Sequence, residues 1–440
     1  MRGYNEFIKI INNSWIICHG AGNNACSMLN NEEFLVYRKK ILFFVDGDEQ
    51  KLGCYIGSGK DKYEIKSISE VLPSNEVVVV ITVSDYKTIG EYYDSKDITW
   101  FSWVEMAREM VFSHFPKEIP SPRFFVLNTP DYINLGDHAI TLGQKKFLSK
   151  YNREIYEVGS SICDEKTLIR LKEYICPDDV IFIQGGGNMG SLWKTCEDNI
   201  RRIINIFTEN VIIVFPQSIY YENECDGGEY FKVGQKTYNS HRKLHICLRD
   251  VNSYKFVKEN YTCKSLLVPD MVLLLNEKKE SKREDVGILF REDKERAIST
   301  DYVNTVKNAV AQNGMRIKEI SHHSKDLLGT RYERLEKVLE IYRSSKLIIT
   351  DRLHGMVFSA ITGTPCIAFD NSYAKISSLY ETWLKDKVNI VIAKELPGFE
   401  LTKLISKMIE KDNYKELNLS DKYEGLNKLI KSIIKENNYV

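Results

Sequence analysis

LIITDRLHGMVFSAITGTPCIAFD, residues 347–370, contains a complete strand–helix–strand unit. An apolar strand ends at Asp351, a short loop carries Arg352 and His354, and a helix follows until Gly363-Thr-Pro365 stops it. A second apolar strand then begins at once. Because both strands are continuously apolar, we expect them to lie side by side in a parallel sheet that is covered on both faces.

The same alternation of apolar strands and helical segments runs along the whole chain of 440 residues, which indicates the α/β class. A proline-rich stretch at 115–125 and a charged stretch at 275–287 interrupt it. We therefore predict three units. Residues 1–115 form a small N-terminal Rossmann-like accessory domain, residues 116–280 a first lobe, and residues 281–440 a second lobe that includes the C-terminal helices.

Composition limits the partners of the protein. Lysine plus arginine equals aspartate plus glutamate, at 61 each, so the chain lacks the basic excess of nucleic-acid-binding proteins. The ten cysteines include no C-x-x-C pair, and no His/Cys/Asp cluster has the spacing of metal ligands. We expect no metal, no nucleic acid and a reducing, cytoplasmic compartment.

The sequence shows no signal peptide and no apolar window of the roughly 20 residues that a membrane helix needs. The C-terminal stretch 424–437 has an apolar stripe opposite lysines. It would suit contact with the inner face of a membrane, but an amphipathic helix more commonly closes onto a core. At most peripheral membrane contact is expected.

Glycine loops follow two of the apolar strands. HGAGNNA (19–25) places Gly20 and Gly22 before a helix, and Asp46 or Asp48 lies at the distance where a ribose-binding acid is found in dinucleotide sites. The same glycines could serve only close packing. IQGGGNMG (183–190) places Gly186, Gly187 and Asn188 where bare backbone would approach an anion or a facing lobe.

Charged residues gather at predicted strand ends and helix starts. NLGDHAI (134–140) offers Asp137 either as a helix cap or as a carboxylate that accepts a proton from a substrate hydroxyl, with His138 as a packing or surface residue. Arg249, Arg291 and Arg352 each follow a strand, which suggests a clamp for a small polyanion.

His354 stands at a helix start beside an arginine, a position that favours its neutral form. A bound anion would raise the pKa of the imidazole, and the ring could then donate a proton.

Besides the opening stretch, the chain contains NLGDHAI, QGGGNMG, FPQSI, LRDVNSY, VPDMV and ILFR. Read together, these stretches resemble the polysaccharide pyruvyl transferase family over residues 124–385. The resemblance implies two Rossmann-like lobes in a GT-B-like arrangement with the active site between them. It also implies transfer of the enolpyruvyl group of phosphoenolpyruvate to a sugar, forming a pyruvate ketal. The family's R-x-H motif falls on Arg352 and His354, and its strand-end arginine on Arg249. The segment before Lys375 matches only loosely, so no role is assigned to that lysine.

On this reading phosphoenolpyruvate is bound by Arg249, Arg291, Arg352, Gly186, Gly187 and Asn188. His354 is the acid that donates a proton, and Asp137 helps to remove the proton of a sugar hydroxyl. Phosphoenolpyruvate is a donor substrate, and no cofactor is expected. The acceptor is a sugar of a cell-surface polysaccharide or its precursor, free or lipid-linked. Two alternatives stay open: a GT-B glycosyltransferase that uses a nucleotide-sugar, and a non-catalytic member of a polysaccharide assembly complex.

Overall fold

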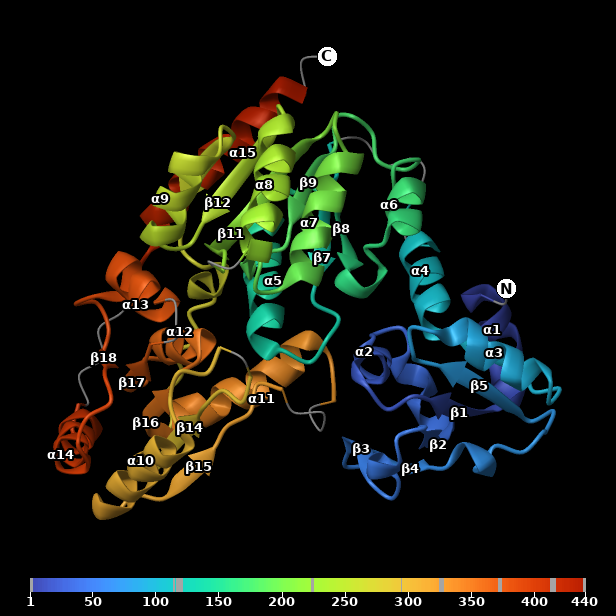
Figure 1. Cartoon of the computed structure of the whole chain (residues 1–440), viewed down its shortest axis with the longest axis horizontal. Coiled ribbons are helices and arrows are strands. Elements are labelled where there is room, and N and C mark those ends of the chain that lie inside the picture. Colours follow the sequence, from blue (N-terminus) through green and yellow to red (C-terminus); the bar gives the residue numbers. More distant parts are fainter. Residues whose placement is uncertain are drawn as a thin grey trace.

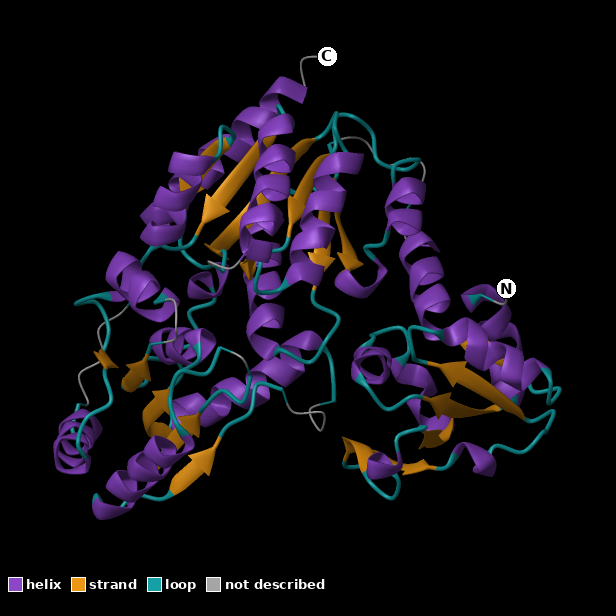
Figure 2. Ribbon diagram, viewed as in Figure 1, coloured by secondary structure: helices purple, strands orange, loops and turns teal. Residues whose placement is uncertain are grey.

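The computed structural model describes residues 3–113, 115, 122–222, 225–293, 295–323, 328–370, 374–411 and 417–437. Figures 1 and 2 show three sheets, each flanked by helices. Nearly all neighbouring strands within them run parallel, and the antiparallel exception is the β3–β4 pair. The α/β class is confirmed.

The N-terminal unit has the strand order β3-β4-β2-β1-β5-β6. Its parallel part, β4-β2-β1-β5-β6, has the order of a Rossmann-like half-fold, with β1 at the centre. The strands are β1 (Trp15–His19), β2 (Ile41–Val45), β3 (Tyr55–Ser58), β4 (Asp61–Lys66), β5 (Val77–Ile81) and β6 (Trp100–Ser102). The helices are α1 (Tyr4–Ile10), α2 (Asn23–Asn30), α3 (Tyr86–Asp94) and α4 (Trp103–Ser113).

The first lobe has the order β13-β12-β11-β9-β7-β8, with β10 paired to β11. The strands are β7 (Phe124–Thr129), β8 (Ile155–Gly159), β9 (Val180–Ile183), β10 (Gly186–Gly190), β11 (Val211–Tyr220), β12 (Leu244–Leu248) and β13 (Lys264–Leu267). The helices are α5 (Leu135–Leu148), α6 (Glu165–Leu171), α7 (Lys194–Ile206), α8 (Cys225–Ser240) and α9 (Val251–Asn260).

The second lobe has the order β15-β14-β16-β17-β18. The strands are β14 (Asp285–Leu289), β15 (Ile317–Glu319), β16 (Ser345–Thr350), β17 (Cys366–Phe369) and β18 (Ile390–Ala393). The helices are α10 (Thr300–Gln312), α11 (Arg331–Ser344), α12 (Leu353–Thr362), α13 (Lys375–Leu379) and α14 (Gly398–Ile409). The opening stretch of the sequence therefore forms β16, α12 and β17, as its pattern predicts.

Both lobes place their second strand outside the first, so the strand order reverses between β7 and β9 and again between β14 and β16. Ligands of open α/β sheets bind at such reversal points, beyond the carboxyl ends of the strands. The two reversal points face each other across the boundary between the lobes, in a GT-B-like arrangement of Rossmann-like lobes. The first residue of α5 bonds directly to the second lobe, since Leu135 N donates to the carbonyl of His322 at 3.0 Å.

The last helix, α15 (Glu424–Asn437), packs on the first lobe, although the expected division assigned it to the second. Leu426 and Ile430 are fully buried, and Asn427 accepts a hydrogen bond from Tyr151 at 2.8 Å. Figure 1 shows this red helix beside α9. The apolar stripe thus covers a core, which supports the core-closing alternative.

Helix α4 joins the N-terminal unit to the first lobe. Its first half contributes Trp103 and Met106 to the core of the N-terminal unit, whereas Phe112 belongs to the core of the first lobe. Arg108, between them, pairs with Asp164 before α6 at 2.5 Å and donates to Thr167 at 2.7 Å. The two units therefore share a helix.

Candidate active site

A cavity of about 300 Å³ lies between the two lobes, at their strand-order reversal points. Loops after β7, β9, β14 and β16 all reach it. Its lining consists of Asn23, Tyr132, Ile133, Asn134, Asp137, Gly187, Asn188, Trp193, Cys196, Arg249, Arg291, Asp293, Glu295, His322, His323, Arg352, Leu353, His354 and Lys375. Of the residues predicted for the central site, only Gly186 is absent from this lining.

His354 occupies the first turn of α12 and carries no hydrogen bond at Nε2 from any described residue. The nearest carboxylate oxygen is Oδ2 of Asp270, at 3.8 Å. Burial, and then the positive charges of Arg249 and Lys375, hold the pKa of His354 well below its usual value. The direction of this shift favours the neutral imidazole.

Gly136 of α5 lies against the ring of His354. A Cβ at this position would stand 2.3 Å from Nδ1 and 2.6 Å from Cγ of the imidazole. The glycine of the NLGDH stretch is thus required by close approach of the opposite lobe. It places the first turn of α5 and the first turn of α12 in direct contact.

Arg249 is almost fully buried at the end of β12, with 1% of its surface exposed. Its Nη1 pairs with Asp270 at 2.7 Å, and its Nε donates to Ser218 at 2.9 Å. Trp383, from the second lobe, donates to its backbone carbonyl at 2.7 Å. These bonds fix the guanidinium, and Nη2 lies 3.0 Å from the position of a Cβ on Gly187.

The glycine-rich segment after β9 supports this arrangement. Gly187 leaves room for Arg249 and for Nζ of Lys375, which would be 3.6 Å from a Cβ there. The backbone N–H of Asn188 donates to Oε1 of Gln217 at 3.0 Å. Gly186 has φ +140° and is not among the residues that line the cavity. The segment forms the short strand β10 rather than the expected loop.

The other two predicted arginines differ in their pairing. Arg352 donates through Nη1 to His323 at 3.0 Å, and its Nε has no hydrogen-bond partner among the described residues. Arg291 instead holds Asp293 with two bonds, of 2.8 and 3.0 Å, and pairs with Glu295 at 3.0 Å. Its charge is therefore balanced by neighbouring carboxylates, whereas Arg352 faces the cavity with no carboxylate partner in the described ranges.

Lys375 is a cavity residue to which the sequence assigned no role. It is 8% exposed and pairs with Glu295 at 2.6 Å. Burial, together with Arg291 and Arg249, outweighs the attraction of Glu295 and lowers the pKa of Lys375 to about 8. The lysine starts α13, and this short helix touches α9 of the first lobe.

Asp137 lies in the first turn of α5, with its Oδ2 accepting hydrogen bonds from Tyr132 at 2.9 Å and Asn134 at 2.8 Å. Asn134, rather than Asp137, caps the helix by accepting from Gly136 N. Burial raises the pKa of the Asp137 carboxyl, although the Tyr132 hydroxyl opposes this. The carboxyl thus lines the cavity as a group suited to take a proton.

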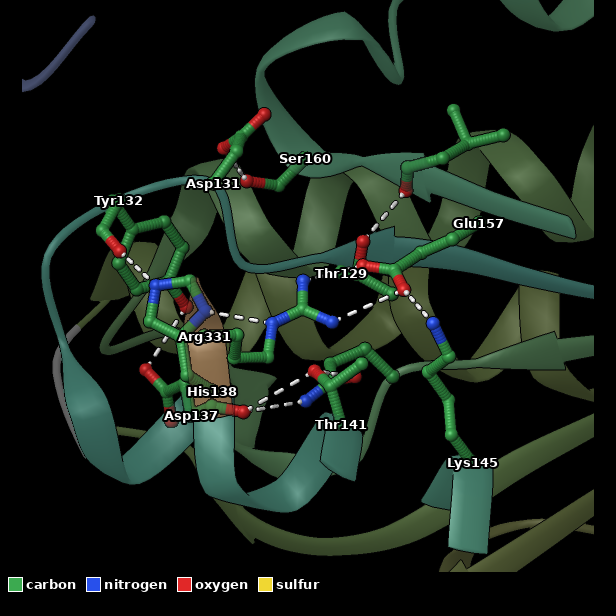
Figure 3. Close-up of polar contacts among 12 residues, drawn as sticks. Thr129, Asp131, Tyr132, Asp137, His138, Thr141, Lys145, Glu157, Ser160 and Arg331 are labelled. Atoms are coloured by element: carbon green, nitrogen blue, oxygen red, sulfur yellow. Dashed lines mark hydrogen bonds and ion pairs between the residues drawn. The ribbon is translucent and has the colours of Figure 1, made fainter. Parts of the chain in front are cut away.

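His138, the next residue, points to the other side of the same helix turn (Figure 3). Its Nε2 donates to the carbonyl of Tyr132 at 2.5 Å, and its Nδ1 accepts from Nε of Arg331 at 3.1 Å. Burial and the charge of Arg331 lower its pKa far below the usual value. It is a packing residue, and it is 3% exposed, so a surface position is excluded.

In the candidate site of the N-terminal unit, neighbouring groups of the chain already bond to the carboxylate of Asp46. Asp46 accepts from the amides of Ala21 at 2.8 Å and Asp48 at 3.0 Å, and pairs with Lys51 at 3.0 Å. Gly20 has φ +103°, as a tight turn requires, and a Cβ on Gly22 would meet open space. A ligand role for Gly20, Gly22 and Asp46 stays a prediction. The helix after this loop nevertheless reaches the central cavity through Asn23.

Across the described ranges, no group of three or more His, Cys, Asp or Glu side chains is arranged to hold a metal ion. Within the same ranges, no helix is both long and apolar enough to cross a bilayer.

The model of the polysaccharide pyruvyl transferase family matches residues 134–373, from the start of the α5 loop to just before Lys375. The chain belongs to this family. The match contains all the described cavity residues of the first lobe from Asn134 onward, as well as Arg352 and His354. The resemblance to this family is thereby confirmed, and the roles of the individual cavity residues stay predictions.

Two individual proteins are also similar in sequence to this chain. General stress protein 30 of Bacillus subtilis is 31% identical over 312 residues, which are 69% of this chain and 90% of that protein. Pyruvyl transferase 1 of Schizosaccharomyces pombe is 27% identical over 294 residues, which are 61% and 72% of the two chains. Among solved structures, a functionally uncharacterized protein of Klebsiella pneumoniae covers 65% of this chain and 97% of its own, at 18% identity and a TM-score of 0.43.

Proposed function

We propose that this family member transfers the enolpyruvyl group of phosphoenolpyruvate to a sugar and closes a pyruvate ketal across two hydroxyls. The observation that carries the proposal is the convergence of strand-end segments of both lobes on a cavity of about 300 Å³ with Arg249, Arg352, Lys375 and His354 in its lining. A compact dianion or trianion suits this set of fixed cations.

The donor brings a phosphate and a carboxylate. Arg352 has unsatisfied donor capacity at Nε, and Lys375 supplies a point charge deep in the cavity. Asp270 and Ser218 hold the guanidinium of Arg249 in place, so Nη2 is the nitrogen that is left to contact the donor. Arg291 acts mainly through Asp293 and Glu295, which orient the lysine and the loop after β14.

His354 is the proposed acid. A bound trianion offsets the surrounding cations that keep the imidazole neutral, so its pKa rises and the ring gains a proton. The proton passes from His354 to the methylene carbon of the donor, which becomes a methyl group. Positive charge then develops at the neighbouring carbon, and a sugar oxygen bonds to it.

Asp137 is the proposed base for that sugar hydroxyl. Both hydrogen bonds it receives from described residues fall on Oδ2, which leaves Oδ1 to accept the hydroxyl proton. The carbon–oxygen bond to phosphate then breaks, and a second sugar hydroxyl bonds to the same carbon. The two sugar hydroxyls release two protons in all. One replaces the proton that His354 gave to the methylene carbon, and the other leaves with inorganic phosphate, so the reaction balances without a redox partner.

Replacing Arg352 with Gln is expected to abolish the thermal stabilisation that phosphoenolpyruvate gives the full-length protein. Loss of a charge-assisted contact to a bound anion weakens binding by about 2–5 kcal/mol, a factor of 30 or more. Differential scanning fluorimetry with phosphoenolpyruvate measures the shift.

The matched control is Arg316→Gln, because Arg316 is 76% exposed and pairs with surface acids. It should keep the full shift. Stabilisation of the wild-type protein by nucleotide-sugars and not by phosphoenolpyruvate would favour the glycosyltransferase alternative and reject the donor proposed above.

Affinity for phosphoenolpyruvate should fall as the pH rises through about 8, because Lys375 then loses its proton. Its pKa in the folded protein lies below the ordinary value, so the charged form is lost earlier than for an exposed lysine. If only the charged form binds, Kd rises about tenfold per pH unit above this value. Isothermal titration calorimetry between pH 7 and 9.5 measures the effect.

Lys375→Arg keeps its charge throughout this range and should flatten the alkaline decline, whereas Lys403→Arg on the exposed face of α14 should leave it unchanged. A decline of the same size in Lys375→Arg would assign it to another group.

A further inference from the structure

A second cavity, of about 610 Å³, adjoins the proposed active site. The two cavities share Tyr132 and Ile133, and the neighbouring residues Asp137 and His138 line one cavity each. The turn that starts α5 is therefore the partition between them. A molecule in the larger cavity would meet the active site at the Tyr132–Asp137 pair.

Helix α2 of the N-terminal unit runs along both cavities. Asn23 lines the smaller one, and Cys26, Ser27 and Asn30 line the larger one. These positions are spaced i, i+3, i+4 and i+7, so they form one face of the helix. Gly329 of the second lobe donates to Asn30 at 3.3 Å, which fixes this face against the loop before α11.

The opposite wall is polar and held in place. Arg331 pairs with Glu157 through both terminal nitrogens and donates to His138, and Lys145 also reaches Glu157, at 3.4 Å (Figure 3). Asp131 accepts from Ser160 at 2.8 Å and from Ser161 N at 2.9 Å. Its carboxylate is thus oriented by the turn after β8.

An aromatic and aliphatic strip completes the lining, with Trp103, Ala107, Met110 and Val111 from α4, and Phe115, Ile155, Tyr156 and Ile162. Planar polar groups opposite an apolar, partly aromatic strip suit a sugar, which has hydroxyls around its edge and C–H faces above and below.

The charged residues in the lining of the larger cavity indicate which class of sugar it would bind. The lining carries five acids, Glu32, Glu33, Asp131, Glu154 and Glu157, against three bases, Lys145, Arg331 and Arg334. An excess of acids disfavours a polyphosphate or an acidic glycan. Arg334 is 4% exposed and forms no ion pair within the described part of the chain, so oxygen dipoles of a neutral ligand would compensate it.

We infer that the larger cavity binds a neutral oligosaccharide, the acceptor, and that α2 of the N-terminal unit forms its roof. This inference rests on the proposed function, since the end of the oligosaccharide would present its hydroxyls to Asp137. The N-terminal unit then selects the acceptor, and the smaller cavity holds the donor. The size of the larger cavity, about twice that of the donor cavity, suits more than one sugar ring.

The test is an array of neutral and acidic di- to hexasaccharides probed with the labelled full-length protein, followed by calorimetry with the best-bound glycan. We expect wild-type binding to neutral glycans. Ser27→Trp fills the roof and should weaken that binding at least tenfold, and Tyr156→Phe should weaken it less. Thr88→Trp, on exposed α3 of the same unit, should have no effect.

The same variants are tested for stabilisation by phosphoenolpyruvate, which Ser27→Trp should retain. Capture of acidic glycans only, of no glycan, or unchanged affinity in Ser27→Trp would overturn the inference. Loss of glycan binding in Ser27→Trp together with no response of the wild type to phosphoenolpyruvate would keep the saccharide site and reject the donor instead.

Discussion

Gly136→Ala is expected to lower turnover by about 10²-fold or more while the protein stays folded. The added Cβ would stand 2.3 Å from Nδ1 of His354, so either the imidazole rotates or the two lobes move apart at the active site. Misplacing a general acid removes most of its contribution, which is typically 10²–10⁴-fold. Phosphate release from phosphoenolpyruvate in the presence of an acceptor glycan measures the loss.

The helix itself should tolerate this change, because alanine is the better helix former by about 1 kcal/mol. Gly425 gives a matched control: it is also the second residue of a helix, and its nearest neighbour, Leu266, would be 3.8 Å from a new Cβ. Gly425→Ala should keep full activity. Normal turnover in Gly136→Ala would mean that His354 is not held by this contact during catalysis.

Arg249→Met is expected to destabilise the protein by about 3–5 kcal/mol and to abolish binding of phosphoenolpyruvate. The change leaves Asp270, which is 1% exposed, as a buried carboxylate without its cation, and breaking such a pair from one side is costly. Urea denaturation followed by tryptophan fluorescence measures the stability, and calorimetry measures binding.

The effect on stability and the effect on donor binding can be separated in the double variant Arg249→Met with Asp270→Asn. The amide oxygen can still accept from Val272 N, as the carboxylate does at 2.9 Å, but the orphaned charge is gone. We expect much of the stability to return without donor binding. A double variant that binds phosphoenolpyruvate normally would remove Arg249 from the donor site.

The sequence was sufficient to place most of the central site. Arg352, His354, Arg249 and Asp137 each follow a strand or open a helix, and parallel sheets bring such positions to one edge. That local rule works because it depends only on chain order within a lobe. Gly186, which has φ +140°, is the residue of the predicted set that the cavity lining does not include.

Other site residues depend on how the lobes pack. Lys375 and Trp193 reach the cavity from the ends of quoted stretches but were assigned no role, and Asn23 comes from a different unit. No periodicity within one segment carries that information. Arg291 is a different case: Asp293 and Glu295 follow it closely in RED and KER, so the balancing acids were visible in the sequence.

Helix α15 shows the same limit. Its pattern of Leu426, Ile430 and Ile433 predicts an apolar face, and the helix forms. Which core receives that face depends on the path of the chain after α14, and it returns to the first lobe.

Because α4 contributes side chains to two cores, the N-terminal unit cannot swing away without bending a helix or opening a core. The distance from α2 to the Tyr132–Asp137 pair is therefore set by covalent and packed structure. If the larger cavity binds the acceptor as proposed above, this fixed distance would limit how many sugar rings fit between α2 and Asp137.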